Sequence, residues 1–243
     1  MTRAARRRAL RRALRTVGRL FLAGVVVTAV PLAFLRFVPP VTSAFMVRSH
    51  WMDPATGLPC ETIHYRWVER EAIATDLALA VVVAEDQRFL DHHGLDFEAM
   101  RRALRERWRQ GRVRGASTLT QQLAKNLFLW PDASYLRKAI EAWLAVSMET
   151  LWPKHRILEL YLNVVQFGPC TFGAAAASTR YFDRPPSELA PDQAALLATV
   201  LPNPYKLRAH APGPYAQART LEILRLMAEH RWLRRRLWSE TGP

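Results

Sequence analysis

Residues 84–96 read AEDQRFLDHHGLD, and this stretch decides how the rest of the chain is arranged. It opens with the acid pair Glu85–Asp86, continues to the imidazoles of His92 and His93, and follows directly on the apolar run Leu77–Val83. Charged side chains are rarely buried at the end of an apolar helix without a partner or a task. We therefore expect an apolar helix that carries ionisable groups to the rim of a site.

The positive charge of the chain is concentrated at its two ends. The net charge is +14 over 243 residues, but residues 1–19 carry eight arginines and no acid, and residues 231–240 carry four arginines against one glutamate. The segment between them is close to balanced. Basic ends beside apolar segments are typical of proteins at an anionic membrane surface, and nucleic acid is not an expected partner. The length allows one or two domains.

An uncharged, mostly apolar run occupies residues 20–35, between Arg19 and Arg36. Extended to residue 38, it is long enough to span the hydrocarbon of a membrane. The arginines before it place residues 1–19 in the cytoplasm and the chain after residue 38 outside. We therefore expect a single-pass anchor over residues 20–38. A cleaved signal peptide is the alternative, although the basic segment is long for one.

From residue 70 onward the apolar residues follow a helical period, and alternating strand patterns are almost absent. Residues 39–69 are interrupted by prolines and Gly57, and they read as an irregular linker with one short strand near residues 62–68. The expected fold class is mainly α, with one domain over residues 70–243. Asp96 suits the N-cap of the second helix. The expected helices cover residues 72–91, 97–110, 117–128, 134–151, 153–165, 172–181, 191–201 and 215–227, the last with an extension to 238.

The two cysteines, Cys60 and Cys170, are far apart and lack the spacing of a metal site. A disulfide in an oxidising compartment and two unpaired thiols are both compatible with the sequence.

A second polar block, GASTLTQQLAKN, covers Gly115–Asn126. It places Gln121 and Lys125 on one helix face, and Gln122 and Asn126 on another, because each pair is four residues apart. A helix N-terminus with a lysine and no neighbouring acid suits an anionic ligand such as phosphate. A solvated helix face is the alternative.

Two shorter blocks follow. Arg137, Lys138 and Glu141 are three and four residues apart, so they share a helix face, where they form either part of a site or a surface ion pair. The helix over residues 153–165 carries Glu159, Tyr161 and Asn163, and the next polar residue is Gln166. For this block the sequence leaves bracing of the fold and a direct role equally open.

These motifs resemble those of the family 51 glycosyltransferases, the peptidoglycan glycosyltransferases, over about residues 70–228. The branch most similar is the monofunctional one of Gram-negative bacteria. No serine is followed by a lysine three residues later, so we expect no transpeptidase domain of the Ser-x-x-Lys type. In chain order the matching residues are Glu85-Asp86, Phe89, His92, Gly94, Asp96, Gly115, Ser117-Thr118, Thr120-Gln121-Gln122, Lys125-Asn126, Arg137-Lys138, Glu141, Glu159, Tyr161-Leu162-Asn163, residues 194–198, Pro202 and Pro204.

The resemblance implies a lysozyme-like helical domain in the periplasm, anchored to the inner membrane, that polymerises lipid II into β-1,4-linked glycan strands. The transfer inverts the anomeric centre and releases undecaprenyl pyrophosphate. By the same resemblance Glu85 is the general base, and Glu141 assists the leaving group, directly or through a bound Mg²⁺ or Mn²⁺. A lysozyme-like muramidase or lytic transglycosylase is the alternative function.

The resemblance also implies which residues bind substrate and which partners the chain has. The pyrophosphate would be held by Lys125 and Arg102, with Arg137 and Lys138 beside them. The apolar tip at residues 126–131, with Trp108, resembles the membrane-dipping region of the family. Implied partners are lipid II, the nascent strand, membrane lipids and proteins of the division or elongation machinery. The remaining expected site residues are Gln121, Gln122 and Asn126, which would line the donor cleft, and Ser117, as a supporting group.

Overall fold

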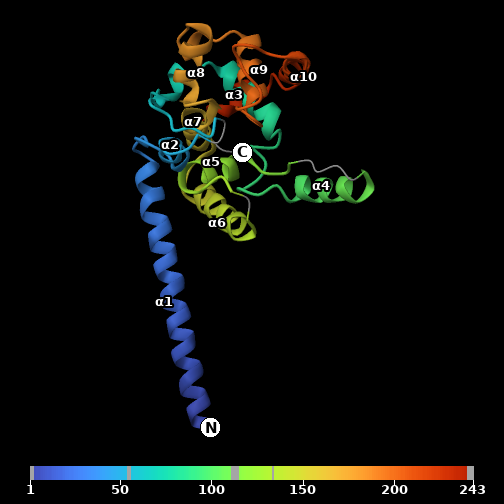
Figure 1. Cartoon of the computed structure of the whole chain (residues 1–243). Helices are drawn as coiled ribbons and strands as arrows, with labels where there is room; N and C mark the ends of the chain where they lie inside the picture. The colour runs from blue at the N-terminus through green and yellow to red at the C-terminus, as the bar shows by residue number, and fades with distance from the viewer. Residues whose placement is uncertain (1–2, 54–55, 111–114, 133, 240–243) are drawn as a thin grey trace. The chain divides into compact units, whose positions relative to one another are not determined.

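A computed structural model describes residues 3–53, 56–110, 115–132 and 134–239 of the chain. The chain divides into two compact units, Met1–Val38 and Pro39–Pro243. The first unit is the helix α1 (Arg3–Leu35), drawn in blue in Figure 1. Its stretch Arg15–Leu35 is 21 residues long and contains an 18-residue window with a mean hydropathy of 2.0, so it is long and apolar enough to cross a membrane.

The second unit is mainly helical, as expected, with one small sheet. Strand β3 (Thr171–Phe172) lies in the middle of that sheet, parallel to β1 (His64–Tyr65) and antiparallel to β2 (Gln166–Gly168). The helices are α2 (Ala44–Ser49), α3 (Thr75–Glu85), α4 (Phe97–Gln110), α5 (Leu119–Phe128), α6 (Tyr135–Leu151), α7 (Lys154–Val164), α8 (Gly173–Phe182), α9 (Pro191–Val200), α10 (Pro214–Glu229) and α11 (Leu233–Leu237), with short 3₁₀ turns at Arg70–Ala72 and Pro186–Glu188.

Helix α3 is the centre of the core. All seven residues of Leu77–Val83 are buried, because α9, α10 and α11 pack around this helix. The alanines of α9, among them Ala194, Ala195 and Ala198, are also buried and let that helix approach α3 closely. Burying each valine or leucine stabilises the fold by about 1.5–3 kcal/mol. The packing therefore fixes the end of α3, where the ionisable residues begin.

Helix α3 ends at Glu85, so the prediction of a helix through residue 91 was wrong at that end. Asp86 leaves the helical conformation, and its Oδ2 accepts a hydrogen bond of 2.9 Å from the backbone N–H of Leu119, at the start of α5. Gly94 follows with φ +88°, and a Cβ atom there would lie 2.9 Å from the carbonyl of Ala145. The Asp86 carboxylate thus caps α5, and Gly94 packs closely against the backbone of α6. These two contacts take the place of the helical turns that were expected after Glu85.

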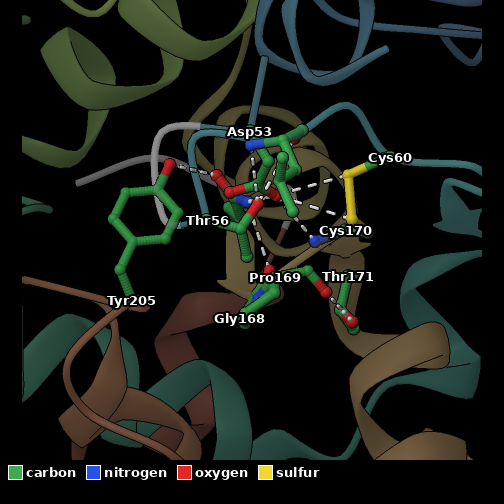
Figure 2. The surroundings of a disulfide bond; sticks show 10 residues. Asp53, Thr56, Cys60, Gly168, Pro169, Cys170, Thr171 and Tyr205 are labelled. Atoms are coloured by element: carbon green, nitrogen blue, oxygen red, sulfur yellow. Dashed lines mark hydrogen bonds between the residues drawn. A yellow bond between two sulfur atoms is a disulfide. The ribbon is translucent and has the colours of Figure 1, made fainter. Parts of the chain in front are cut away.

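The described residues of the segment 39–69, which are 39–53 and 56–69, belong to the second compact unit and do not form the expected linker. Helix α2 contacts α5, and β1 lies in the sheet. Figure 2 shows the strongest tie, a disulfide between Cys60 and Cys170 whose Cα atoms are 5.8 Å apart. Cys170 has φ +54°, a left-handed conformation that costs about 1–2 kcal/mol for a residue other than glycine. This segment has the proline-rich composition typical of a linker, but a covalent bond between Cys60 and Cys170 fixes it to the rest of the second unit.

The basic C-terminal tail is folded. Helix α10 ends at Glu229, and α11 is a separate short helix, so the helix does not continue without a break to residue 238. Leu233 and Leu237 are buried, and Arg234 forms an ion pair with Asp76 in the first turn of α3. The tail therefore completes the cover of α3.

Candidate active site

Glu85 is the last residue of α3, and its carboxylate is held by a side chain of α5. Its Oε2 accepts a hydrogen bond of 2.9 Å from Nε2 of Gln122. Burial raises the pKa of Glu85 above its usual range, and the hydrogen bond from Gln122 and the charges of Arg219 and Lys125 oppose this rise. A partly desolvated carboxylate with a raised pKa is suited to accept a proton near neutral pH.

Asp86 and His92 brace this end of the helix. Both side chains are buried, and His92 Nε2 lies 2.9 Å from Oδ2 of Asp86, the oxygen that also accepts from the Leu119 N–H. The Thr118 hydroxyl donates to the carbonyl of Gly94 at 2.6 Å. These contacts join α3 to α5 and hold one carboxylate oxygen of Asp86, a residue that lines the same cleft as Glu85.

Glu85 borders a cleft of about 440 Å³ between the end of α3, the start of α4 and the segment before α5. Arg102 and Ser117, both expected in the site, line the same cleft. Arg102 is exposed and forms an ion pair of 3.6 Å with Glu98 of its own helix, an exposed pair that leaves the guanidinium accessible to a ligand in the cleft. The cleft thus brings together a carboxylate, a guanidinium and a hydroxyl.

A second cluster surrounds Glu141 in α6. Its buried carboxylate accepts a hydrogen bond of 2.7 Å from Arg137 Nη1 and one of 2.5 Å from Lys138 Nζ. Lys138 also donates to the Ser117 hydroxyl at 2.7 Å, which links this cluster to the cleft. Burial lowers the pKa of Lys125, whereas the charges of Glu141 and Glu85 raise it. Lys125 therefore interacts electrostatically with both carboxylates.

The groups around Glu141 do not fit a divalent cation. Both carboxylate oxygens already face a positive nitrogen, and a third cation would be repelled there. Within the part of the chain that the structure describes, Glu141 belongs to no group of three or more Asp, Glu, His or Cys side chains placed to share an ion. We therefore assign no step to a metal.

Two expected binding residues have other surroundings. Gln121 is buried, and its side chain forms a capping box with Thr118 at the start of α5, so it does not point into the cleft. Asn126 is buried and is not among the residues that line the cleft. Arg137 and Lys138 lie beside Glu141 and reach the cleft only through Ser117.

The motif in α7 that contains Glu159, Tyr161 and Asn163 has two kinds of residue. Some brace the fold, and one contacts the candidate site. Asn163 bonds both backbone groups of Val68, and Glu159 accepts from the backbone N–H of Arg70, so these two residues fix the chain before α3. Tyr161, in contrast, donates a hydrogen bond of 2.8 Å to Oε1 of Gln122, the residue that holds Glu85.

Arg219 near Glu85 was missed by sequence reasoning. It lies in α10, and its Nη2 is 3.4 Å from the carbonyl oxygen of Ala84. A separation of 135 residues leaves no local pattern that could have indicated the contact.

Comparison with known proteins agrees with this geometry. A sequence model of the family described as Transglycosylase matches residues 56–228. A biosynthetic peptidoglycan transglycosylase of Aeromonas hydrophila is 46% identical over 219 residues, which cover 90% of this chain and 92% of the relative. Relatives with the same description from Citrobacter koseri and Klebsiella oxytoca are 46% and 47% identical over 224 and 212 residues, and these cover 89% and 87% of this chain and 91% and 88% of the relatives. The chain belongs to the transglycosylase family, that is, the family 51 glycosyltransferases that act in peptidoglycan synthesis.

Proposed function

We propose that the chain polymerises lipid II into β-1,4-linked glycan strands, with Glu85 as the general base. The observation that carries the proposal is the position of Glu85. It is a carboxylate with a raised pKa at the rim of a cleft, held by Gln122, with cations from three helices nearby. The acceptor would be the GlcNAc 4-hydroxyl of an incoming lipid II, and the donor the growing strand on its polyprenyl pyrophosphate.

In this mechanism Glu85 takes the proton from the acceptor hydroxyl as its oxygen attacks the anomeric carbon of the donor. The new C–O bond forms while the bond to the pyrophosphate breaks, and the pyrophosphate leaves with the electron pair. One displacement inverts the anomeric centre, so the chemistry requires no covalent glycosyl-enzyme. General-base assistance of this kind contributes a factor of about 10²–10⁴.

The leaving pyrophosphate needs positive groups, and the site supplies them in two places. Arg102 lines the cleft, and Lys125, Arg137 and Lys138 lie around Glu141. Guanidinium and ammonium groups stabilise phosphate oxygens through charge-assisted hydrogen bonds. We assign to Glu141 the task of holding Arg137 and Lys138 in place, because both its oxygens are occupied by them.

The proposed place of action is the inner membrane, with residues 1–19 in the cytoplasm and the second unit in the periplasm. The apolar stretch of α1 and the arginines before it support this orientation. The disulfide suits an oxidising compartment. Large apolar side chains of α4 and α6, among them Trp108, Tyr135 and Leu136, are exposed and would meet the lipid in which the polyprenyl tails lie.

The test is to incubate the purified full chain in detergent with labelled lipid II, and in parallel with isolated cell-wall sacculi. We expect glycan polymer from lipid II and no release of soluble fragments from sacculi. Soluble muropeptides from sacculi without polymer from lipid II would instead establish the hydrolase alternative.

A further inference from the structure

Three side chains from three helices form one hydrogen-bonded chain that ends on Glu85. Tyr161 in α7 donates to Oε1 of Gln122 in α5 at 2.8 Å, and Nε2 of Gln122 donates to Oε2 of Glu85 at 2.9 Å. Tyr161 is fully buried and is among the largest buried side chains of the protein. Its hydroxyl is therefore presented to Gln122 by rigid packing and not by a mobile surface group.

The direction of the chain follows from the chemistry of its ends. An ionised carboxylate only accepts hydrogen bonds, so the NH₂ group of Gln122 must face Glu85 and its carbonyl oxygen must face Tyr161. Tyr161 must then donate, which requires a protonated phenol. Burial, followed by the charges of Glu85 and Asp86, raises the pKa of Tyr161 well above its usual value, so the phenol keeps its proton. Successive hydrogen bonds of this kind polarise one another.

We propose that Tyr161 is a positioning residue for the general base: through Gln122 it holds and stabilises the ionised carboxylate of Glu85. This inference rests on the proposed function, because it concerns the same base. Without the phenol, Oε1 of Gln122 would lose its only protein donor among the described residues. The amide would then be free to turn, and the carboxylate would lose part of the stabilisation of its charge.

Other charged groups also act on Glu85, and they must be separated from this effect. Arg219 from α10 and Lys125 from α5 favour the ionised form, whereas neighbouring Asp86 and the desolvation of the site oppose it. Replacing Tyr161 by phenylalanine changes none of these charges. A change in the titration of Glu85 in that variant can therefore be assigned to the hydrogen-bonded chain.

The protein contains a matched control for the loss of a tyrosine hydroxyl. Tyr205 donates to Oε1 of Gln166 at 2.7 Å, in the corner closed by the disulfide. Tyr205→Phe removes the same group from the same kind of partner, but away from Glu85. A general effect of deleting a tyrosine hydroxyl bonded to glutamine would appear in both variants, and an effect on the base only in Tyr161→Phe.

The experiment measures the pH dependence of kcat/KM for lipid II polymerisation in the wild type, Tyr161→Phe, Gln122→Ala, the double variant and Tyr205→Phe. In Tyr161→Phe we expect the acid limb to move to higher pH by up to about one unit, since fewer hydrogen bonds stabilise the carboxylate. The decrease in kcat/KM relative to the wild type should be several-fold at pH values below the limb and smaller at pH values above it. In the Gln122→Ala background, Tyr161→Phe should produce no further shift, because the two residues act in series.

A second measurement needs no activity and guards against a fold defect in Tyr161→Phe. The carboxyl ¹³C signal of Glu85, assigned by its loss in Glu85→Gln, is titrated in the wild type and with 3-fluorotyrosine at position 161. The fluorinated phenol is a stronger donor with nearly unchanged shape, so we expect the pKa of Glu85 to fall. A role in packing alone would leave that pKa unchanged.

The outcomes separate the two proposals. A wild type that makes no polymer from lipid II would overturn the proposed function, whereas the ¹³C titration would still report on the hydrogen-bonded chain. A wild type that polymerises lipid II, with an acid limb unchanged in Tyr161→Phe or shifted equally in Tyr205→Phe, would overturn the role of Tyr161.

Discussion

The same three groups, a tyrosine, a glutamine and a carboxylate, occur in series at two places in this molecule. At the cleft, Tyr161 donates to Gln122 and Gln122 donates to Glu85. At the disulfide corner (Figure 2), Tyr205 donates to Gln166 at 2.7 Å, and Nε2 of Gln166 lies 3.4 Å from Oδ2 of Asp53. The hydrogen-bond pattern is alike, but the surroundings of the two carboxylates differ.

Asp53 is completely buried, and its Oδ2 also accepts the backbone N–H of Cys170 at 3.0 Å. It is covered by the disulfide and can meet no substrate. Glu85 borders an open cleft that Arg102 also lines, and Lys125 lies within electrostatic reach of Glu85. The triplet alone therefore makes no active site. In the proposed mechanism, access for an acceptor and positive charge for a leaving group are what distinguish the carboxylate of Glu85 from that of Asp53.

The largest effect is expected from Glu85→Gln. Loss of the base should reduce kcat for lipid II polymerisation by about 10²–10⁴, while the melting temperature should not fall, because a buried charge is removed. Activity is measured with labelled lipid II and stability by thermal unfolding in detergent. An enzyme that kept its rate after this substitution would show that the proton is taken by another group.

Removing the disulfide should be next in size, and it should act on stability alone. The double variant Cys60→Ser/Cys170→Ser loses a covalent link between residues 110 apart, which we expect to lower the free energy of unfolding by about 2–4 kcal/mol. Denaturant unfolding of the variant, and of the wild type with and without reductant, measures this. At low temperature the variant should keep its activity, and a loss there without unfolding would mean that the corner acts on the cleft.

A smaller change is expected from Asp53→Asn, the counterpart of Glu85→Gln at the corner. Asparagine can still accept from Cys170, but its NH₂ group replaces an oxygen in a fully buried site, and this mismatch should destabilise the protein by about 1–2 kcal/mol. The rate of polymerisation should stay near that of the wild type. A loss of rate as large as that of Glu85→Gln would break the distinction between the two carboxylates.

The smallest effect is expected in the pH dependence of kcat/KM of the unmodified enzyme. Its two limbs should be displaced from the ordinary pKa values of glutamate and lysine. Glu85 must be ionised to act, and its pKa is raised by burial, so kcat/KM should fall at an acid limb above the ordinary glutamate value of about 4.3. Lys125 must be protonated to hold phosphate, and its pKa is lowered by burial, so the alkaline limb should lie below about 10.4. A profile limited by these two groups is therefore narrower than one for exposed side chains, and an acid limb at or below 4.3 would contradict the raised pKa of Glu85.

The sequence predicted most helices because their apolar period and caps are local. Asp96 is an example, since it accepts the backbone N–H of Ala99 at 2.8 Å and begins α4 at the expected Phe97. The end of α3 could not be predicted in this way. It depends on a bond between Asp86 and Leu119, 33 residues later, and on the close approach of Gly94 to α6.

The candidate site was predictable as a set of residue types and only partly as an arrangement. The spacing of Arg137, Lys138 and Glu141 correctly places these side chains together, because i, i+3 and i+4 neighbours share a helix face. The same rule gave no reason to join Tyr161 to Gln122, since that contact depends on how α5 packs against α7. The capping role of Gln121 is local, a Thr-x-x-Gln box with Thr118, and the sequence interpretation missed it. The pairing of Cys60 with Cys170 likewise follows from contacts between distant loops.

The packing of α9, α10 and α11 on α3 also affects when the candidate site can form during synthesis of the chain. The helix that carries Glu85 is synthesised before α9, α10 and α11, which pack on it. Arg219, which bonds the backbone beside Glu85, follows Ala84 by 135 residues. At typical rates of translation this delay is on the order of ten seconds. During that interval the growing chain carries Glu85 on a helix that lacks its packing partners, so the candidate site forms only after α10 and α11 have been made.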